Sequence, residues 1–146
     1  MKINIIGSGT MGSVIMGNQS ILVNDILFDI GSGVVKKIEQ LGLATKDVNY
    51  LVITHSHADH FSDLPNFLIG RGIRGENNKL LHIICGKGIR EKTIALFDLT
   101  FGDGIPDKYK NFEEKFNVKF VEMENGGSFE TPEFKLTAFE LEHGTC

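Results

Sequence analysis

The feature that most constrains this chain is an apolar strand signal that runs directly into a cluster of histidines. Residues 51–53 are uninterrupted apolar and partly β-branched residues, which are typical of a buried strand. The sequence HSHADH follows at residues 55–60, so three imidazoles and one carboxylate lie just past the expected strand end. Imidazole nitrogens with one hard oxygen suit zinc and are tolerable to manganese or iron. The sequence therefore predicts a metal site here.

The candidate metal ligands in this segment are His55, His57, Asp59 and His60. His55 and His57 are separated by one residue, so in extended backbone both rings point to the same side, as two ligands of one ion must. The alternative is a polar loop whose histidines merely face water, and the clustering argues against it. His82 lies inside another apolar run, where a lone histidine is usually a packed residue, and we exclude it as a ligand.

The pattern HxHxDH directly after a buried strand resembles the metallo-β-lactamase fold superfamily. Residues 1–10 (MKINIIGSGT) and 57–65 (HADHFSDLP) look most like its ribonuclease Z and phosphodiesterase branch. The resemblance implies an α/β (α+β) fold, the N-terminal half of a four-layer αβ/βα sandwich with a mixed sheet flanked by helices. We expect one domain over residues 1–146 that ends shortly after the third metal-binding histidine, without the family's bridging aspartate and last histidine.

The resemblance also implies a set of ligands for a first metal ion. In the superfamily a later histidine, at a strand end and followed by a small residue, binds this ion, and His143-Gly144 resembles that element. His55, His57 and His143 are therefore expected to hold one ion, with its fourth position left for water. By itself His143 would be read as an exposed residue at the end of a strand.

The remaining site residues follow from the same resemblance. Asp59 and His60 are expected to begin a second metal site, and Asp59 is the candidate catalytic residue that orients or deprotonates the attacking water. The DxG element Asp29-Ile30-Gly31 resembles one whose aspartate orients a metal-binding histidine without touching the metal. For Asp29 the alternative is a simple turn former.

The function that this resemblance implies is metal-dependent hydrolysis of phosphodiester bonds in RNA or a nucleotide, by a metal-activated water. One or two zinc ions are expected as cofactor, with manganese or iron as substitutes. Two alternatives stay open. The first is a metal-binding truncated module without turnover, and the second is a hydrolase of another ester, amide or thioester.

A glycine-rich motif supports a remote alternative, a dinucleotide-binding protein. Residues 2–6 read as a strand, residues 7–12 (GSGTMG) match GxGxxG, and Asp29 lies about twenty residues on. That fingerprint requires a helix after its last glycine. Residues 13–30 are instead rich in β-branched residues and broken by turn residues at 17–20 and 24–25. We therefore predict a glycine-rich loop at Gly7 to Gly12 and short strands at 14–16, 21–23 and 26–30.

The rest of the chain reads as alternating helices and strands. We expect Ser32 to N-cap a helix through Leu41 with Gly42 as its C-cap. Helices are predicted over 61–69, from 89 to about 99 and from 109 to 116, with a loop at 70–78. Strands are predicted at 80–84, 118–123 and 134–141, with a turn at 125–127.

Composition excludes several classes. A net charge of -4 argues against a general affinity for nucleic acid, although basic residues concentrate between Arg71 and Lys92, where they form either a phosphate-binding segment or a solvated face. No apolar stretch is long enough to span a bilayer, and the N-terminus is not a signal peptide, so we expect a cytoplasmic protein without a membrane partner. Cys85 and Cys146 form no disulfide framework and receive no role.

The expected partner follows from the pattern of the strands. The strands at 51–54, 80–84 and 134–141 are apolar on both faces or nearly so, which suits a sheet covered on both sides. With one half of the sandwich absent, an inner sheet face would be exposed to water. We therefore expect a homodimer or a complementing C-terminal half.

Overall fold

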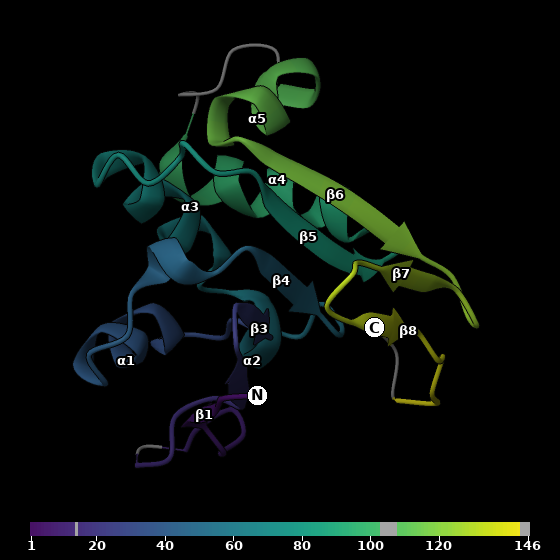
Figure 1. Ribbon diagram of the computed structural model, residues 1–146. Helices are drawn as coiled ribbons and strands as arrows, with labels where there is room; N and C mark the ends of the chain where they lie inside the picture. The colour runs from purple at the N-terminus through teal and green to yellow at the C-terminus, as the bar shows by residue number, and fades with distance from the viewer. Residues whose placement is uncertain (14, 103–107, 144–146) are drawn as a thin grey trace.

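The computed structural model describes residues 1–13, 15–102 and 108–143. Six strands form one mixed sheet in the order β1-β2-β3-β4-β5-β6, and β7 and β8 form a second, two-stranded antiparallel sheet (Figure 1). Strands β1 to β3 pair antiparallel, and β3 to β6 pair parallel. The strands are β1 (Ile3–Gly7), β2 (Ser20–Val23), β3 (Ile26–Phe28), β4 (Tyr50–Ile53), β5 (Leu81–Gly86), β6 (Val118–Met123), β7 (Ser128–Glu130) and β8 (Lys135–Thr137).

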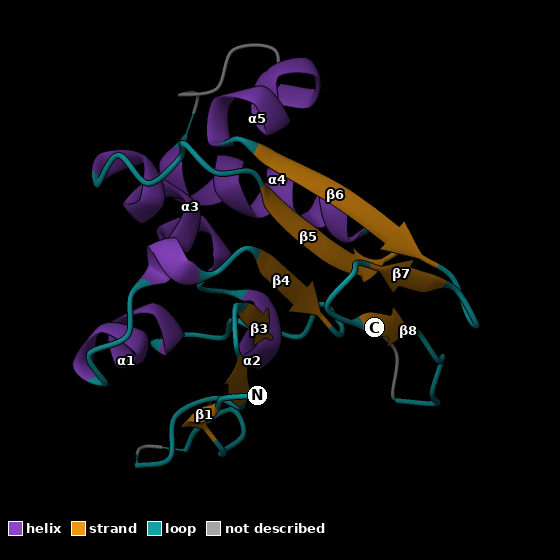
Figure 2. Cartoon of the chain, in the orientation of Figure 1, coloured by secondary structure: helices purple, strands orange, loops and turns teal. Residues whose placement is uncertain are grey.

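The helices connect the parallel strands and pack on one face of the six-stranded sheet, while β7 and β8 lie on the other side (Figure 2). This arrangement is the predicted mixed sheet flanked by helices. None of the helices in the described residues is long and apolar enough to cross a membrane. The helices are α1 (Val34–Gln40), the 3-10 helix η1 (Thr45–Asp47), α2 (Ala58–Phe61), α3 (Leu64–Ile73), α4 (Ile89–Phe101) and α5 (Lys108–Phe116).

The core lies between the sheet and the helices, and strand alternation decides which residues enter it. Leu51 and Ile53 of β4 face the helices and are almost completely buried. Tyr50, on the opposite face of β4, is half-buried and packs edge-on against Phe134 of the segment between β7 and β8, with ring centroids 4.8 Å apart. Towards the edge strand β1 this outer face opens, and Ile5 is 67% exposed.

The glycine-rich stretch forms a loop, as predicted, and its neighbour differs from the prediction. The strand predicted at 14–16 is wrong at Ile15 and Met16, which form a turn, and Val14 lies outside the described residues. The loop folds back on itself, with Gly9 N donating to Gly17 O at 2.8 Å. In the described residues between Gly12 and β2 the chain forms turns, so the helix that a dinucleotide fingerprint requires is not formed.

The cap predicted for α1 is wrong. Gly33, with a left-handed φ of 85°, occupies the N-cap position. Because glycine has no side chain, this residue cannot cap the helix through a side-chain hydrogen bond. The carboxylate of Asp63 accepts a hydrogen bond of 3.0 Å from Val35 N instead. Asp63 is distant in sequence, which is why a local pattern pointed to Ser32. At the other end Leu41, not the predicted Gly42, occupies the C-cap position, and Gly42 follows it with a left-handed φ of 69°.

Helix α3 continues to Ile73, so the predicted start of a loop at residue 70 is wrong. The reason is Arg71, which is 1% exposed and packs in the core. Its guanidinium donates to four backbone carbonyls, which substitute for the water that a charged group normally requires. These acceptors are the carbonyls of Thr45, Val48, Glu76 and Lys79.

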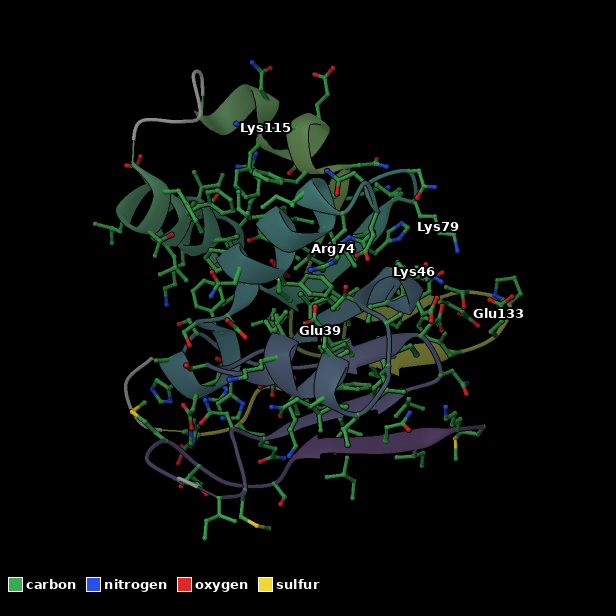
Figure 3. The ribbon with its side chains drawn as sticks, turned by 90° about the vertical axis from the view of Figure 1, so that its left-hand side faces the viewer. Glu39, Lys46, Arg74, Lys79, Lys115 and Glu133 are labelled. Carbon is green, nitrogen blue, oxygen red and sulfur yellow. The ribbon has the colours of Figure 1, made fainter. Side chains whose placement is uncertain are left out.

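The basic segment from Arg71 to Lys92 therefore does not form one continuous phosphate-binding surface. Arg71 is buried, and Arg74 pairs with Glu39 of α1, towards which it points in Figure 3. Arg90 pairs with Glu113 at 2.8 Å.

The strand predicted at 134–141 is also shorter than expected. β8 ends at Thr137, and the described residues after it have no regular structure. The reason is its pairing, because within the described residues β8 pairs with the three residues of β7 and with no strand of the larger sheet. Gly144, Thr145 and Cys146 lie outside the described residues.

Candidate metal centre

The histidine motif begins where β4 ends, at the carboxyl edge of the parallel strands. His55 and Ser56 lie in the connection, His57 has extended backbone at the N-cap of α2, and Ala58 to Phe61 form this one-turn helix. The helix thus begins one residue before Asp59, so Asp59 and His60 belong to it rather than preceding it. Phe61, 6% exposed, anchors the turn in the core.

Three histidines from two distant segments meet at this edge. One ring nitrogen from each of His55, His57 and His143 can be chosen so that all three lie within 4.8 Å of one another. His55 Nε2 and His57 Nδ1 are 3.0 Å apart, and the ring of His143 lies 4.9 Å from that of His55. His143 reaches them from an irregular segment, not from the strand end that the sequence predicted.

A second group joins Asp29, His60 and Asp59. His60 Nδ1 lies 2.8 Å from Asp29 Oδ2, and its Nε2 lies 3.6 Å from Asp59 Oδ2. A histidine whose Nδ1–H is fixed by a carboxylate presents Nε2 as the acceptor, the arrangement found behind many metal-binding histidines. The rings of His55 and His60 are 4.2 Å apart, so the two groups adjoin.

Asp29 also fixes the start of the motif. Thr54 donates to its carboxylate through the backbone N–H, at 2.8 Å, and through the side-chain hydroxyl, at 2.9 Å. Asp29 is buried and has a left-handed φ of 58°, which is uncommon for a residue with a side chain and tends to mark functional positions. One carboxylate therefore orients both ends of the segment from Thr54 to His60.

Gly31 explains the second half of the DxG element. A Cβ at this position would overlap the backbone carbonyl of Asp59. The close approach is maintained by backbone bonds on both sides, with Ile30 N donating to His60 O at 2.7 Å and Asp63 N donating to Ile30 O at 2.9 Å. Glycine is required because two backbones touch.

The electrostatics of the cluster favour neutral imidazole at His55. Burial lowers the pKa of His55, and the neighbouring His60 and His57 lower it further. A neutral ring keeps a lone pair for a metal ion, because a protonated one cannot coordinate. Cys85 contrasts with this group, since burial, with Glu122 and Glu91, raises the pKa of its thiol to about 12, and the thiol stays protonated at neutral pH.

The structure adds features that sequence reasoning missed. A cavity of about 290 Å³ opens beside Asp59, between the glycine-rich loop and α2, and is lined mainly by small polar residues and glycines. Lys92 of α4 donates a hydrogen bond of 2.6 Å to Ser56, within the motif. No local pattern connects either feature to the histidines. By contrast His82, which we excluded, stacks on Tyr50 with ring centroids 5.4 Å apart.

The fold and the histidine motif define a class, the metallo-β-lactamase fold. A metallo-β-lactamase fold protein of Bacillus subtilis, YhfI, superposes with a TM-score of 0.69 at 16% identity, covering 98% of this chain and 55% of that one. The short form of human tRNase Z gives a TM-score of 0.66 at 21% identity, over 85% of this chain and 45% of that chain. These likenesses confirm the predicted fold.

Sequence comparison gives the family. The family model described as anti-Pycsar protein Apyc1 matches residues 1–146, and the chain belongs to this family. The chain is also similar to ribonuclease Z of Staphylococcus saprophyticus, with 31% identity over 120 residues, and of Staphylococcus carnosus, with 27% identity over 128 residues. Each match covers 81% of this chain and 35% of the relative, so the chain spans about a third of the relatives' length. The resemblance to ribonuclease Z is confirmed.

Proposed function

We propose that the protein is a metal-dependent hydrolase of phosphodiester bonds and that its substrate is RNA or a nucleotide. The observation that carries the proposal is the convergence of His55, His57 and His143 from two segments of the chain. The similarity to proteins named ribonuclease Z supports the reaction class.

The donor set fits zinc. Two nitrogens on a tetrahedral zinc ion, with bonds of about 2.05 Å, are roughly 3.4 Å apart, and the three ring nitrogens lie within 4.8 Å of one another. His60 Nε2 and Asp59 would begin a site for a second ion, and manganese or iron are substitutes of compatible chemistry. When bound, such an ion lowers the pKa of water and stabilises negative charge on the reacting phosphate.

The protein's own groups then have separate tasks. Asp59, half-buried between His60 and the 290 Å³ cavity, is the candidate to orient the attacking water and accept its proton. Asp29 keeps the ring of His60 in one orientation. The cavity beside Asp59 offers room for the part of the substrate next to the reacting phosphate.

The test combines metal content with turnover. Zinc per chain is measured for wild type and for His57→Ala, and hydrolysis of bis(p-nitrophenyl) phosphate is measured with zinc or manganese. We expect metal-dependent hydrolysis by wild type and loss of both zinc and hydrolysis in the variant. Zinc binding without hydrolysis of this probe would support the alternatives, a module without turnover or a hydrolase of another ester, amide or thioester.

We propose further that the chain acts as one domain and that the open part of its outer sheet face, next to β1, is covered by a second copy or by a complementing C-terminal half. The exposed Ile3 and Ile5 on the edge strand β1 support this, because contiguous apolar surface is rarely left open to water. Light scattering at low micromolar concentration is the test. A folded monomer that binds no hydrophobic dye would contradict the proposal.

A further inference from the structure

Lys92 approaches the histidine motif from the neighbouring strand connection. It lies near the start of α4, after β5, and its Nζ donates to Ser56 Oγ at 2.6 Å. Ser56 stands between His55 and His57 in the chain. Because β4 and β5 are parallel neighbours, the connections after both strands meet at one edge of the sheet, where α/β proteins bind ligands. The ammonium group of Lys92 is thus bonded to the residue that separates the candidate ligands His55 and His57 in the chain.

The charge of Lys92 is not matched by a carboxylate. Within the described residues no carboxylate oxygen lies at ion-pair distance from its Nζ, whereas Arg74 and Arg90 each pair with glutamate. The position does not stabilise α4 either, because a cation near a helix N-terminus meets the positive end of the helix dipole. An ammonium group has three donors, and Ser56 accepts one of them. Two donors are therefore available to oxygens of a ligand.

We infer that Lys92 binds a phosphate oxygen of the substrate and that Ser56 positions its ammonium group for this contact. The inference rests on the proposed phosphodiester hydrolysis. A phosphodiester is an anion whose non-bridging oxygens accept charge-assisted hydrogen bonds, which are stronger than neutral ones. Lys92 supplies positive charge from the connection after β5, while His55, His57 and Asp59 lie in the connection after β4.

A purely structural role would have different consequences. If the bond from Lys92 to Ser56 served only to tie the motif to α4, its loss would disturb the histidines, and zinc binding and thermal stability would fall. If Lys92 binds substrate, its loss raises KM and weakens anion binding while metal content stays the same. Arginine retains the positive charge and the reach, so it separates these two roles further.

The experiment uses the full chain loaded with zinc and two probes, bis(p-nitrophenyl) phosphate for turnover and inorganic phosphate for binding by calorimetry. The variants are Lys92→Met, Lys92→Arg and Ser56→Ala. Lys46→Met is the matched control, because Lys46 is an exposed lysine in η1, before the opposite end of β4, and lies on the side of the molecule that carries Lys79 (Figure 3). Zinc per chain and Tm are measured for every variant.

We expect Lys92→Met to raise KM and the phosphate Kd about tenfold or more, the loss typical of a hydrogen bond to a charged group. Lys92→Arg should stay close to wild type, Ser56→Ala should show a smaller rise, and Lys46→Met should show none. Zinc content and Tm should not change in any of them.

Three outcomes would overturn the inference. The first is an unchanged KM and an unchanged phosphate Kd in Lys92→Met. This result would overturn the role of Lys92 alone, because hydrolysis by the wild type would still support the proposed function. The second is a lower zinc content or a lower Tm in Lys92→Met, which would show that the bond from Lys92 to Ser56 has a structural role. If wild type hydrolyses nothing, the proposed function fails, and the phosphate titration still decides the matter: weaker binding in Lys92→Met supports an anion site, and no binding by wild type overturns it.

Discussion

The two segments that bring histidines to the candidate centre are held in different ways. The segment from Thr54 to His60 starts directly after a buried strand, ends on the buried Phe61, and is fixed by the carboxylate of Asp29. His143 is exposed and follows β8, a strand of three residues that pairs with β7. The first segment is anchored in the core, whereas His143 lies in an exposed segment at the surface.

This difference separates two contributions to metal binding. Groups built into the core are oriented before an ion arrives, so damage to their supports should cost both stability and affinity. A peripheral ligand contributes affinity without contributing to the fold. Substitutions in the two segments therefore test the comparison directly, and the expected effects are ordered below from the largest to the smallest.

Gly31→Ala should have the largest effect. Because the new Cβ would overlap the backbone of Asp59, the motif must move away from the DxG element. We expect a loss of about 3 kcal/mol or more in the free energy of unfolding, together with loss of zinc binding, measured by urea denaturation and metal analysis. Gly86→Ala is the control, since its Cβ meets nothing within 4 Å. Equal stability of the two variants would show that the contact with Asp59 is not tight.

His57→Ala and His143→Ala compare the two segments at the metal itself. Each should weaken zinc binding by more than roughly 100-fold, because even the loss of groups behind a ligand typically costs 10- to 100-fold. In the metal-free protein His143→Ala should stay within about 0.5 kcal/mol of wild type, as substitutions of exposed residues usually do. His57→Ala should be less stable, because it removes a half-buried ring bonded to His55. Unchanged zinc stoichiometry in either variant would contradict the ligand assignment.

Asp63→Ala and Ser32→Ala test which residue caps α1. Asp63 accepts from Val35 N and from Asn66 Nδ2, so its loss should cost about 1 to 2 kcal/mol of the free energy of unfolding. Ser32→Ala should change it by less than about 0.5 kcal/mol, since the described bond at Ser32 uses its backbone carbonyl, which accepts from Asn18. The free energy of unfolding of both variants is measured by urea denaturation. A larger loss in Ser32→Ala than in Asp63→Ala would show that Ser32 caps the helix.

The parts of this site that sequence could predict are those set by short-range patterns. The strand at 50–53 and the loop after it follow from an apolar run that stops at a polar cluster, and resemblance to a family added Asp29 and His143. Both of these residues do lie beside the histidines of the motif in the structure.

What sequence could not predict depends on contacts between distant segments. Asp63 caps a helix that lies 28 residues away, and Lys92 reaches Ser56 across 36 residues. Arg71 looked like a surface charge because no local sequence pattern predicts the four backbone carbonyls that accept hydrogen bonds from its guanidinium. β8 looked longer because apolar residues continue to Leu141, whereas its partner strand β7 has only three residues.

The smallest expected effect is a pH dependence of stability in the metal-free protein. Burial lowers the pKa of His55 in the motif and of His82 on the outer sheet face, with help from His60 and His57 at the first and from Lys119 at the second. In the unfolded chain both imidazoles take up protons below about pH 6.5, while in the folded chain they resist protonation until lower pH. The unfolded state therefore binds more protons in this range, and the free energy of unfolding should fall as the pH drops below about 6.5 and be fully retained above it.

His55→Gln and His82→Gln should each flatten this decline, and the double variant should flatten it most. The measurement is urea denaturation of metal-free protein between about pH 7.5 and 5.5, on either side of the free imidazole pKa. A decline that His82→Gln abolishes and His55→Gln leaves unchanged would mean that the motif tolerates a charged imidazole, and that His55 is less tightly built into the core than the contrast with His143 requires.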